Sequence, residues 1–171
     1  MSLYESSVPQ FTKMLENLSK WVDTAVAYAE TKKFDPNTLL QARLAPDQYP
    51  LVRQIQAACD AAKFGAARLS GKEAPKHPDT ETTIDEIKAR LASCIEFLKT
   101  VTAADFAGAD KVMIKLPFFP PGKGCAGPDY LVEMTTPNFY FHVTTAYAIL
   151  RHNGVNLGKM DYIGSLNFKD V

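Results

Sequence analysis

Apolar residues recur at alternating steps of three and four along four separate stretches of the sequence, which is the spacing of one helix face. A helix with a single apolar stripe is marginal alone in water and must bury that stripe against neighbours. The sequence therefore predicts a mainly all-α fold, an antiparallel four-helix bundle that forms a single domain over residues 1–171. The four stripes are Val8, Phe11, Leu15, Leu18, Val22, Ala25 and Ala29; Leu51, Ile55, Ala58, Ala62, Gly65 and Leu69; Ile84, Ile87, Leu91, Cys94, Leu98 and Val101; and Phe139, Val143, Ala146 and Leu150.

Capping signals lie at the expected ends of these helices. We expect Ser7 to cap the first helix and Gly71 to follow the second. Thr83 and Glu86 have the spacing of a capping box at the start of the third helix. Thr136 is followed by proline, which predicts that the last helix begins there.

The link before the last helix has its own pattern. Residues 112–116 and 130–134 alternate apolar side chains with others, which is typical of short strands. The segment Pro117–Pro128 between them is rich in proline and glycine. We therefore expect a short β-hairpin with a wide tip, inserted before the last helix and packed at one end of the bundle. In the earlier link, Asp35 and the proline after it predict a short helix.

Composition excludes several classes of protein. The chain has 19 basic and 19 acidic residues, and this balance lacks the positive footprint of nucleic-acid binding. No stretch has the length and apolarity of a membrane span, and the N-terminus has no secretory signal pattern. The three widely spaced cysteines, Cys59, Cys94 and Cys125, argue against a disulfide framework. We therefore expect a cytoplasmic protein with no nucleic acid and no membrane among its partners.

The histidines do not have metal-binding spacing. We expect His77 to be an exposed loop residue. His142 and His152 are ten residues apart on the last helix, which separates them by about 280° around its axis, so they cannot bind one ion. We expect no metal and no cofactor. His142 is the first candidate for a site, because it titrates near neutral pH on an inner helix; the alternative is a hydrogen-bonded core or pocket-rim histidine.

Two groups of motifs carry a family resemblance. The N-terminal half contains Leu44–Leu51, Gln54, Asp60 and Leu69–Gly71, and the C-terminal part contains Asn138–His142, Ala146–Val155 and Gly158–Gly164. Together they resemble a bacterial and fungal family that is catalogued only as a domain of unknown function and is placed near the DinB/YfiT-like superfamily. The resemblance covers nearly the whole chain. It implies a four-helix bundle with a hairpin-like insertion before the last helix, often as a homodimer.

The sequence departs from the wider superfamily in its metal-binding motif. That superfamily includes metal-dependent thiol transferases and hydrolases, whose signature is one histidine from helix two and two from the last helix. Gln54 stands at about the position where the first of these histidines is expected, and the last helix lacks a second histidine at a suitable spacing. The resemblance therefore does not carry a metal-dependent activity over to this chain.

We expect a homodimeric bundle that binds a small molecule in a cleft between the second and last helices. The expected binding residues are His142, Gln54, Tyr147, Arg151 and Asp60. We expect residues 153–164 to fold over this cleft, with Lys159 and Asp161 as a pair; the alternative is that they only dock the C-terminal segment.

Two other functions remain open at this point. One is a metal-dependent hydrolase or thiol transferase with a degenerate centre built from His142, Asp60 and Gln54. The other is a purely structural interaction module. The sequence assigns no catalytic residue, so an enzyme and a non-catalytic binding protein remain alternatives.

Overall fold

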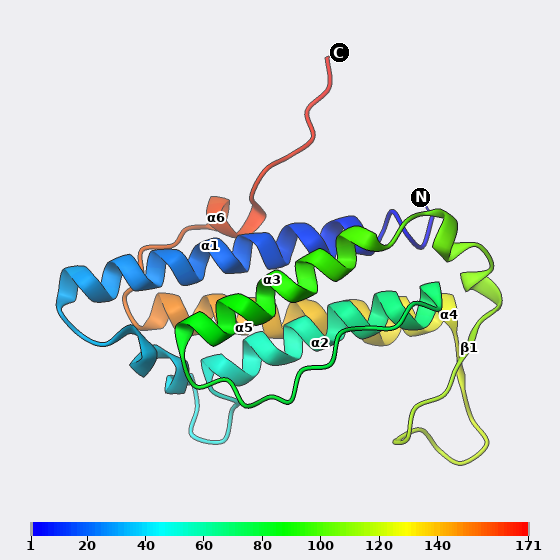
Figure 1. The fold of residues 1–171 in the computed structure, drawn as a ribbon, viewed down its shortest axis with the longest axis horizontal. Helices are drawn as coiled ribbons and strands as arrows, with labels where there is room; N and C mark the ends of the chain where they lie inside the picture. The colour runs from blue at the N-terminus through cyan, green and yellow to red at the C-terminus, as the bar shows by residue number, and fades with distance from the viewer. Residues whose placement is uncertain (1, 171) are drawn as a thin grey trace.

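The computed structural model describes residues 2–170 and contains four long helices packed side by side (Figure 1). Every residue of the four predicted stripes is buried between them. This arrangement confirms the four-helix bundle. The long helices are α1 (Val8–Lys32), α2 (Leu51–Ser70), α3 (Ile84–Thr100) and α5 (Thr136–His152).

The bundle consists of two antiparallel pairs, α1 with α3 and α2 with α5. Between the pairs, α2 and α3 run in the same direction, because residues 71–83 return along the length of the bundle before α3 begins (Figure 1). The residues predicted to form a site all come from α2 and α5, so the pairing of these two helices decides which of them can meet.

The helix ends lie where the signals predict, but two of the expected side-chain caps, at Ser7 and Thr136, are not formed. Thr83 and Glu86 form the capping box of α3, and Gly71 adopts a left-handed φ of 73° after α2. The short helix after Asp35 is present as the 3-10 helix η1 (Pro36–Gln41). Ser7 is the N-cap residue of α1, as predicted, but its side chain does not cap the helix: its hydroxyl donates back to the Leu3 carbonyl at 2.5 Å. Pro9, at the second helical position, carries no N–H for that hydroxyl to accept.

The predicted hairpin is present, but its second arm was placed wrongly. After the 3-10 turns η2 (Ala104–Phe106) and η3 (Ala109–Lys111), β1 (Met113–Ile114) pairs antiparallel with β2 (Cys125–Ala126). Residues 130–134 are not a strand. They belong to a π-helical segment, η4 (Tyr130–Thr135), that follows the short α4 (Gly127–Asp129) and continues directly into α5.

Burial explains why this segment is helical. Tyr130, Leu131 and Thr135 are buried, whereas Val132 is 67% exposed. This pattern places one face of a helix on the bundle and is incompatible with a strand that buries every second residue. α5 begins at Thr136, as predicted, but it continues directly from η4, so Thr136 lies within a longer helical segment and does not cap a free helix end.

The C-terminal segment lies across α1 and not over the α2–α5 seam (Figure 1). Its short helix α6 (Lys159–Ile163) is held by Asn17, which donates to the carbonyl of Tyr162 at 3.1 Å, and by Trp21, which donates to the carbonyl of Asp161 at 3.1 Å. The Asp161 carboxylate accepts from the backbone N–H of Gly158 at 2.6 Å and makes no pair with Lys159. The segment therefore docks against α1, which is the second of the two alternatives given above, and does not fold over the cleft between the second and last helices.

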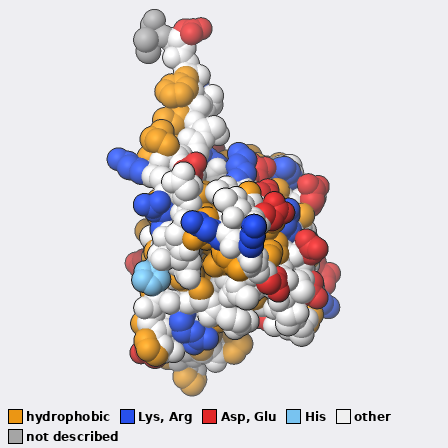
Figure 2. Space-filling model, turned by 90° about the vertical axis from the view of Figure 1, so that its left-hand side faces the viewer, with side chains coloured by type: hydrophobic (Ala, Val, Ile, Leu, Met, Phe, Trp, Pro, Cys, Tyr) orange, Lys and Arg blue, Asp and Glu red, His pale blue; other side chains and the backbone are white. Residues whose placement is uncertain are grey.

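Surface charges are mixed, as the balanced composition predicts. Basic and acidic side chains are interspersed over the end of the bundle shown in Figure 2, and residues after α6 project away from it. No helix within residues 2–170 is long and apolar enough to cross a membrane.

Candidate functional site

The structure brings together His142 and Gln54, two of the predicted site residues. Nδ1 of His142 on α5 donates to Oε1 of Gln54 on α2 at 2.8 Å. The Gln54 amide nitrogen in turn donates to the carbonyl of Tyr49 at 3.1 Å, which identifies Oε1 as the acceptor for the ring. The imidazole is thus fixed in one tautomer, with a lone pair on Nε2.

His142 is neutral at pH 7 in this setting. Burial of the ring is the main cause that lowers the pKa of His142, and the nearby positive charge of Arg53 lowers that pKa further. A neutral, oriented imidazole can accept a hydrogen bond or take a proton through Nε2.

The donors around His142 do not fit a metal ion of the superfamily type. Within residues 2–170, no group of three or more histidine, cysteine, aspartate or glutamate side chains is arranged to hold one. The Gln54 oxygen is already occupied by the N–H of His142, so the ring presents a proton and not a lone pair on that side. We therefore derive no metal-dependent step.

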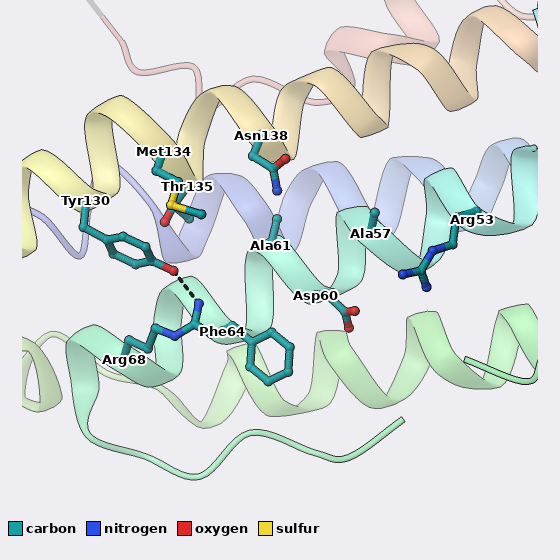
Figure 3. Close-up of a pocket in the computed structure, with 10 residues that line it drawn as sticks. All are labelled: Arg53, Ala57, Asp60, Ala61, Phe64, Arg68, Tyr130, Met134, Thr135 and Asn138. Atoms are coloured by element: carbon teal, nitrogen blue, oxygen red, sulfur yellow. Dashed lines mark hydrogen bonds between the residues drawn. The ribbon is translucent and has the colours of Figure 1, made fainter. Parts of the chain in front are cut away.

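A groove of about 170 Å³ lies beside this pair, between α2 and the helix formed by η4 and α5 (Figure 3). Arg53 precedes Gln54 at one end of it, and Asn138 is one turn before His142. Figure 3 shows Tyr130 and Asn138 reaching from the η4–α5 helix toward α2. The lining residues are Arg53, Ala57, Asp60, Ala61, Phe64 and Arg68 from α2, and Tyr130, Met134, Thr135 and Asn138 from the facing helix.

Arg68 is the groove cation that has no carboxylate partner within residues 2–170. Its Nη1 donates to the hydroxyl of Tyr130 at 2.6 Å, and its guanidinium lies 5.1 Å from the centre of the Phe64 ring. Arg53, by contrast, pairs with Asp79 at 2.5 Å.

Thr135 contributes a buried hydroxyl to the same groove. Its side chain is 3% exposed, and Oγ1 has no hydrogen-bond partner within the described chain. A buried polar atom without a partner costs roughly 1–3 kcal/mol. Thr135 ends the π-helical segment, and π-bulges inside helices occur frequently at functional sites.

Asp60 lines the groove, but its carboxylate is already paired within an ion network centred on Arg90. Nη2 of Arg90 on α3 contacts Asp60 at 2.6 Å, and Nη1 contacts Asp79 at 2.6 Å and Glu81 at 3.0 Å. Burial alone would raise the pKa of Asp79 and Glu81, but their hydrogen bonds to arginine side chains outweigh burial and lower that pKa. This network fastens the segment 71–83 onto α2 and α3.

His77 extends this network and is not an exposed loop residue. Lys63, fully buried on α2, places Nζ 2.9 Å from Asp60 and 2.8 Å from Nδ1 of His77. Nε2 of His77 lies 3.2 Å from the hydroxyl of Ser93. Burial, followed by the charge of Lys63, lowers the pKa of His77.

Tyr147 and Arg151 lie away from this seam. The Tyr147 ring packs against Trp21 and Tyr162, each at 5.5 Å between ring centres, on the side that faces α1. Arg151 is exposed near the end of α5. The structure thus brings His142 and Gln54 into contact and places Asp60 in the lining of the neighbouring groove, whereas Tyr147 and Arg151 lie elsewhere.

Sequence reasoning missed the residues at the far end of the groove. Tyr130 was predicted to begin a strand, Thr135 lies just after that predicted strand and was not singled out, and Arg68 carries no motif of its own. A usable signal was the glycine at position 65 within an apolar stripe, which marks a close approach of another backbone or side chain.

Comparisons with known proteins find a family and a solved structure that match nearly the whole chain. The family model "Domain of unknown function (DUF1993)" matches residues 3–163. The chain is also similar to a solved structure of a DinB family member protein from Shewanella denitrificans, with 50% sequence identity and a TM-score of 0.94. That similarity covers 99% of this chain and 96% of the other. A comparison with the curated proteins finds no match.

Proposed function

We propose a function from one premise: the chain belongs to the DUF1993 family, a group of DinB-like helical bundles whose domain is described as one of unknown function. The groove between α2 and the η4–α5 helix, beside His142 and Gln54, binds a small molecule without a conventional metal site. The observation that carries this proposal is the buried hydroxyl of Thr135, which lines the groove and has no partner within residues 2–170.

The make-up of the groove supports a small ligand. Ligand sites are mostly apolar with a few placed polar groups, and here Ala57, Ala61 and Met134 supply apolar walls. The volume of about 170 Å³ is below the roughly 300 Å³ at which drug-sized sites begin. The ligand is therefore small, or leaves part of itself in solvent.

The cellular setting is part of the same proposal. Cys59, Cys94 and Cys125 are all free thiols in the structure. Free thiols persist in a reducing compartment, which supports the cytoplasmic location expected from the sequence.

Fragment binding tests the proposed function. Chemical-shift mapping of the isotope-labelled protein with a set of neutral, anionic and cationic fragments should perturb backbone amides of Ala57, Ala61 and Asn138. Ala61→Phe fills the groove and should abolish these shifts. Ala27→Phe, on an exposed position of α1, is the matched control and should leave them unchanged. Fragments that bind elsewhere, or that bind the Ala61→Phe variant equally well, would contradict the proposal.

A further inference from the structure

We infer that the ligand of this groove carries an anionic group, a carboxylate or a phosphate, which is bound at the Arg68 end by Arg68, Tyr130 and Thr135. This inference rests on the proposed function, because it names the chemistry of a ligand for the same groove.

Arg68 is prepared to bind an oxyanion. A guanidinium has five N–H donors, and the bond from Nη1 to the Tyr130 hydroxyl uses one of them. The guanidinium lies 5.1 Å from the Phe64 ring centre and 5.8 Å from the Tyr130 ring centre, so two aromatic side chains restrict its position. A restricted planar fork loses little entropy when it binds a carboxylate or phosphate through two parallel hydrogen bonds.

The charge of Arg68 is not neutralised inside the groove. Asp60, the acidic residue that lines the groove, lies eight residues away on α2, a distance of about 12 Å along the helix axis. Its carboxylate is already paired with Lys63 at 2.9 Å and with Arg90 at 2.6 Å. An anion at Arg68 would thus meet an uncompensated positive charge.

The neighbouring hydroxyls add hydrogen-bond donors. Tyr130 accepts from Arg68 through its oxygen, so its own O–H proton remains to be donated, and no protein acceptor takes it within residues 2–170. The buried hydroxyl of Thr135 also lacks a partner in that part of the chain. Since unused donors outnumber unused acceptors at this end, an acceptor-rich anion satisfies the groove better than a neutral or cationic group.

Matched probes separate the anionic group from the rest of a ligand. Benzoate and benzamide have nearly the same shape, but only benzoate is charged. Phenyl phosphate tests a phosphate group in place of the carboxylate. Chemical-shift titration of the wild-type protein should show benzoate, phenyl phosphate or both binding in the groove about tenfold more tightly than benzamide. Whichever anion binds more tightly shows whether the groove prefers a carboxylate or a phosphate. Added salt should lower the affinity of both anions.

Variants assign this preference to the proposed residues. Arg68→Met should reduce the affinity for the anions by about tenfold or more and leave that for benzamide nearly unchanged. Arg68→Lys keeps the charge without the planar fork and should fall between. Thr135→Val removes the hydroxyl at constant shape and should weaken anion binding without lowering the melting temperature. Arg151→Met, at an exposed position of α5, is the control for loss of one positive charge.

The outcomes for this inference and for the proposed function are distinct. If benzamide binds in the groove as tightly as the anions, or if Arg68→Met and Arg68→Lys bind the anions like wild type, the anion inference is wrong while the binding groove stands. If no fragment of any charge perturbs the groove, both are wrong.

Discussion

Gly65 sets how closely α2 can approach the π-helical segment η4. A Cβ built at this position would collide with Cγ2 of Thr135. The contact sits in the middle of the seam that forms the groove, so a single methyl group at position 65 would push apart the two walls of the site. This residue links the packing of the bundle to the shape of the site more directly than any charged group.

Gly65→Ala should therefore destabilise the protein. We expect the free energy of unfolding to fall by about 1–3 kcal/mol, even though alanine is favoured over glycine within a helix by up to about 1 kcal/mol. Thr135→Ser removes the Cγ2 methyl and keeps the hydroxyl, so Gly65→Ala should cost much less in that background. Urea denaturation of the four proteins measures this coupling. An equal loss in both backgrounds would show that the collision is not the cause.

Arg90 is the second residue on which the structure depends heavily. Arg90→Met leaves Asp60, Asp79 and Glu81 without the cation that they share. Asp60 keeps its pair with Lys63 and Asp79 keeps its pair with Arg53, so the loss is that of hydrogen bonds to charged groups, and we expect the free energy of unfolding to fall by about 1.5–3 kcal/mol. The matched control on the same helix is Lys88→Met, whose pair with Asp23 is largely exposed and should cost under about 1 kcal/mol. Similar losses for both variants would contradict this account.

The same groups predict how stability depends on pH. Burial is the main cause that lowers the pKa of His142 and His77 from 6.5, so below that pH the unfolded chain binds protons that the folded chain does not, and stability falls. Arginine hydrogen bonds outweigh burial and lower the pKa of Asp79 from 3.8 and of Glu81 from 4.5, which adds a second loss of stability below about pH 4.5.

Denaturation midpoints measured between pH 8 and pH 3 check this prediction. Replacing the two histidines by His142→Gln and His77→Asn should remove the loss that begins near pH 6.5 and leave the acidic loss in place. A wild-type protein whose stability is constant from pH 7 to pH 5 would rule out the histidine contribution.

At the scale of elements, the sequence predicted the regular helices well and the irregular one badly. The stripes of α2 and α3 keep steps of three and four over their whole length, and the Thr83 capping box is local chemistry that needs no tertiary contact. In η4 the buried residues are Tyr130, Leu131 and Thr135. Bonds from residue i to i+5 widen the turn there, so the helical period disappears and a strand-like alternation remains in the sequence.

The candidate site was predicted only in part for the same reason. His142 was found because a group that titrates near neutral pH on an inner helix is visible in the sequence, and Gln54 was found because the family resemblance places it where a histidine is expected. Tyr130 and Thr135 were missed because their positions depend on the π-helical turn. Arg68 resembles any surface arginine until the absence of a carboxylate within residues 2–170 is seen in the structure.

The α6 segment offers a prediction at this scale. Asp161→Ala removes the acceptor for the Gly158 N–H, and loss of such a cap costs about 1 kcal/mol locally. We expect faster hydrogen exchange over residues 158–164, with little change in the exchange of α2 and α5. Lys159→Ala, which removes no hydrogen bond in the structure, is the control. Equal effects of the two variants would show that the bond from Gly158 to Asp161 is not what holds this segment.

At the scale of the whole molecule, we predict a homodimer, as the resemblance implies. Sedimentation equilibrium over a range of concentrations should give a mass twice that of the 18.9 kDa chain. Large apolar side chains remain exposed, among them Phe141 on α5 at 56% and Tyr49 just before α2 at 54%. Phe141→Glu should weaken the dimer if the Phe141 side chain lies in the interface between the two chains. A mass of one chain at all concentrations would contradict the prediction.

The pairing of α2 with α5 has a consequence for how the protein is made. His142 and Gln54 are 88 residues apart in the chain, so contacts across this seam have a high sequence separation and form slowly. Before α5 has been synthesised, the apolar stripe of α2 lacks its main packing partner. It is then exposed to chaperones and prone to aggregation. A ligand of the groove has nothing to bind at that stage. It would stabilise only chains in which the last helix has docked, and would thereby favour finished molecules over nascent ones.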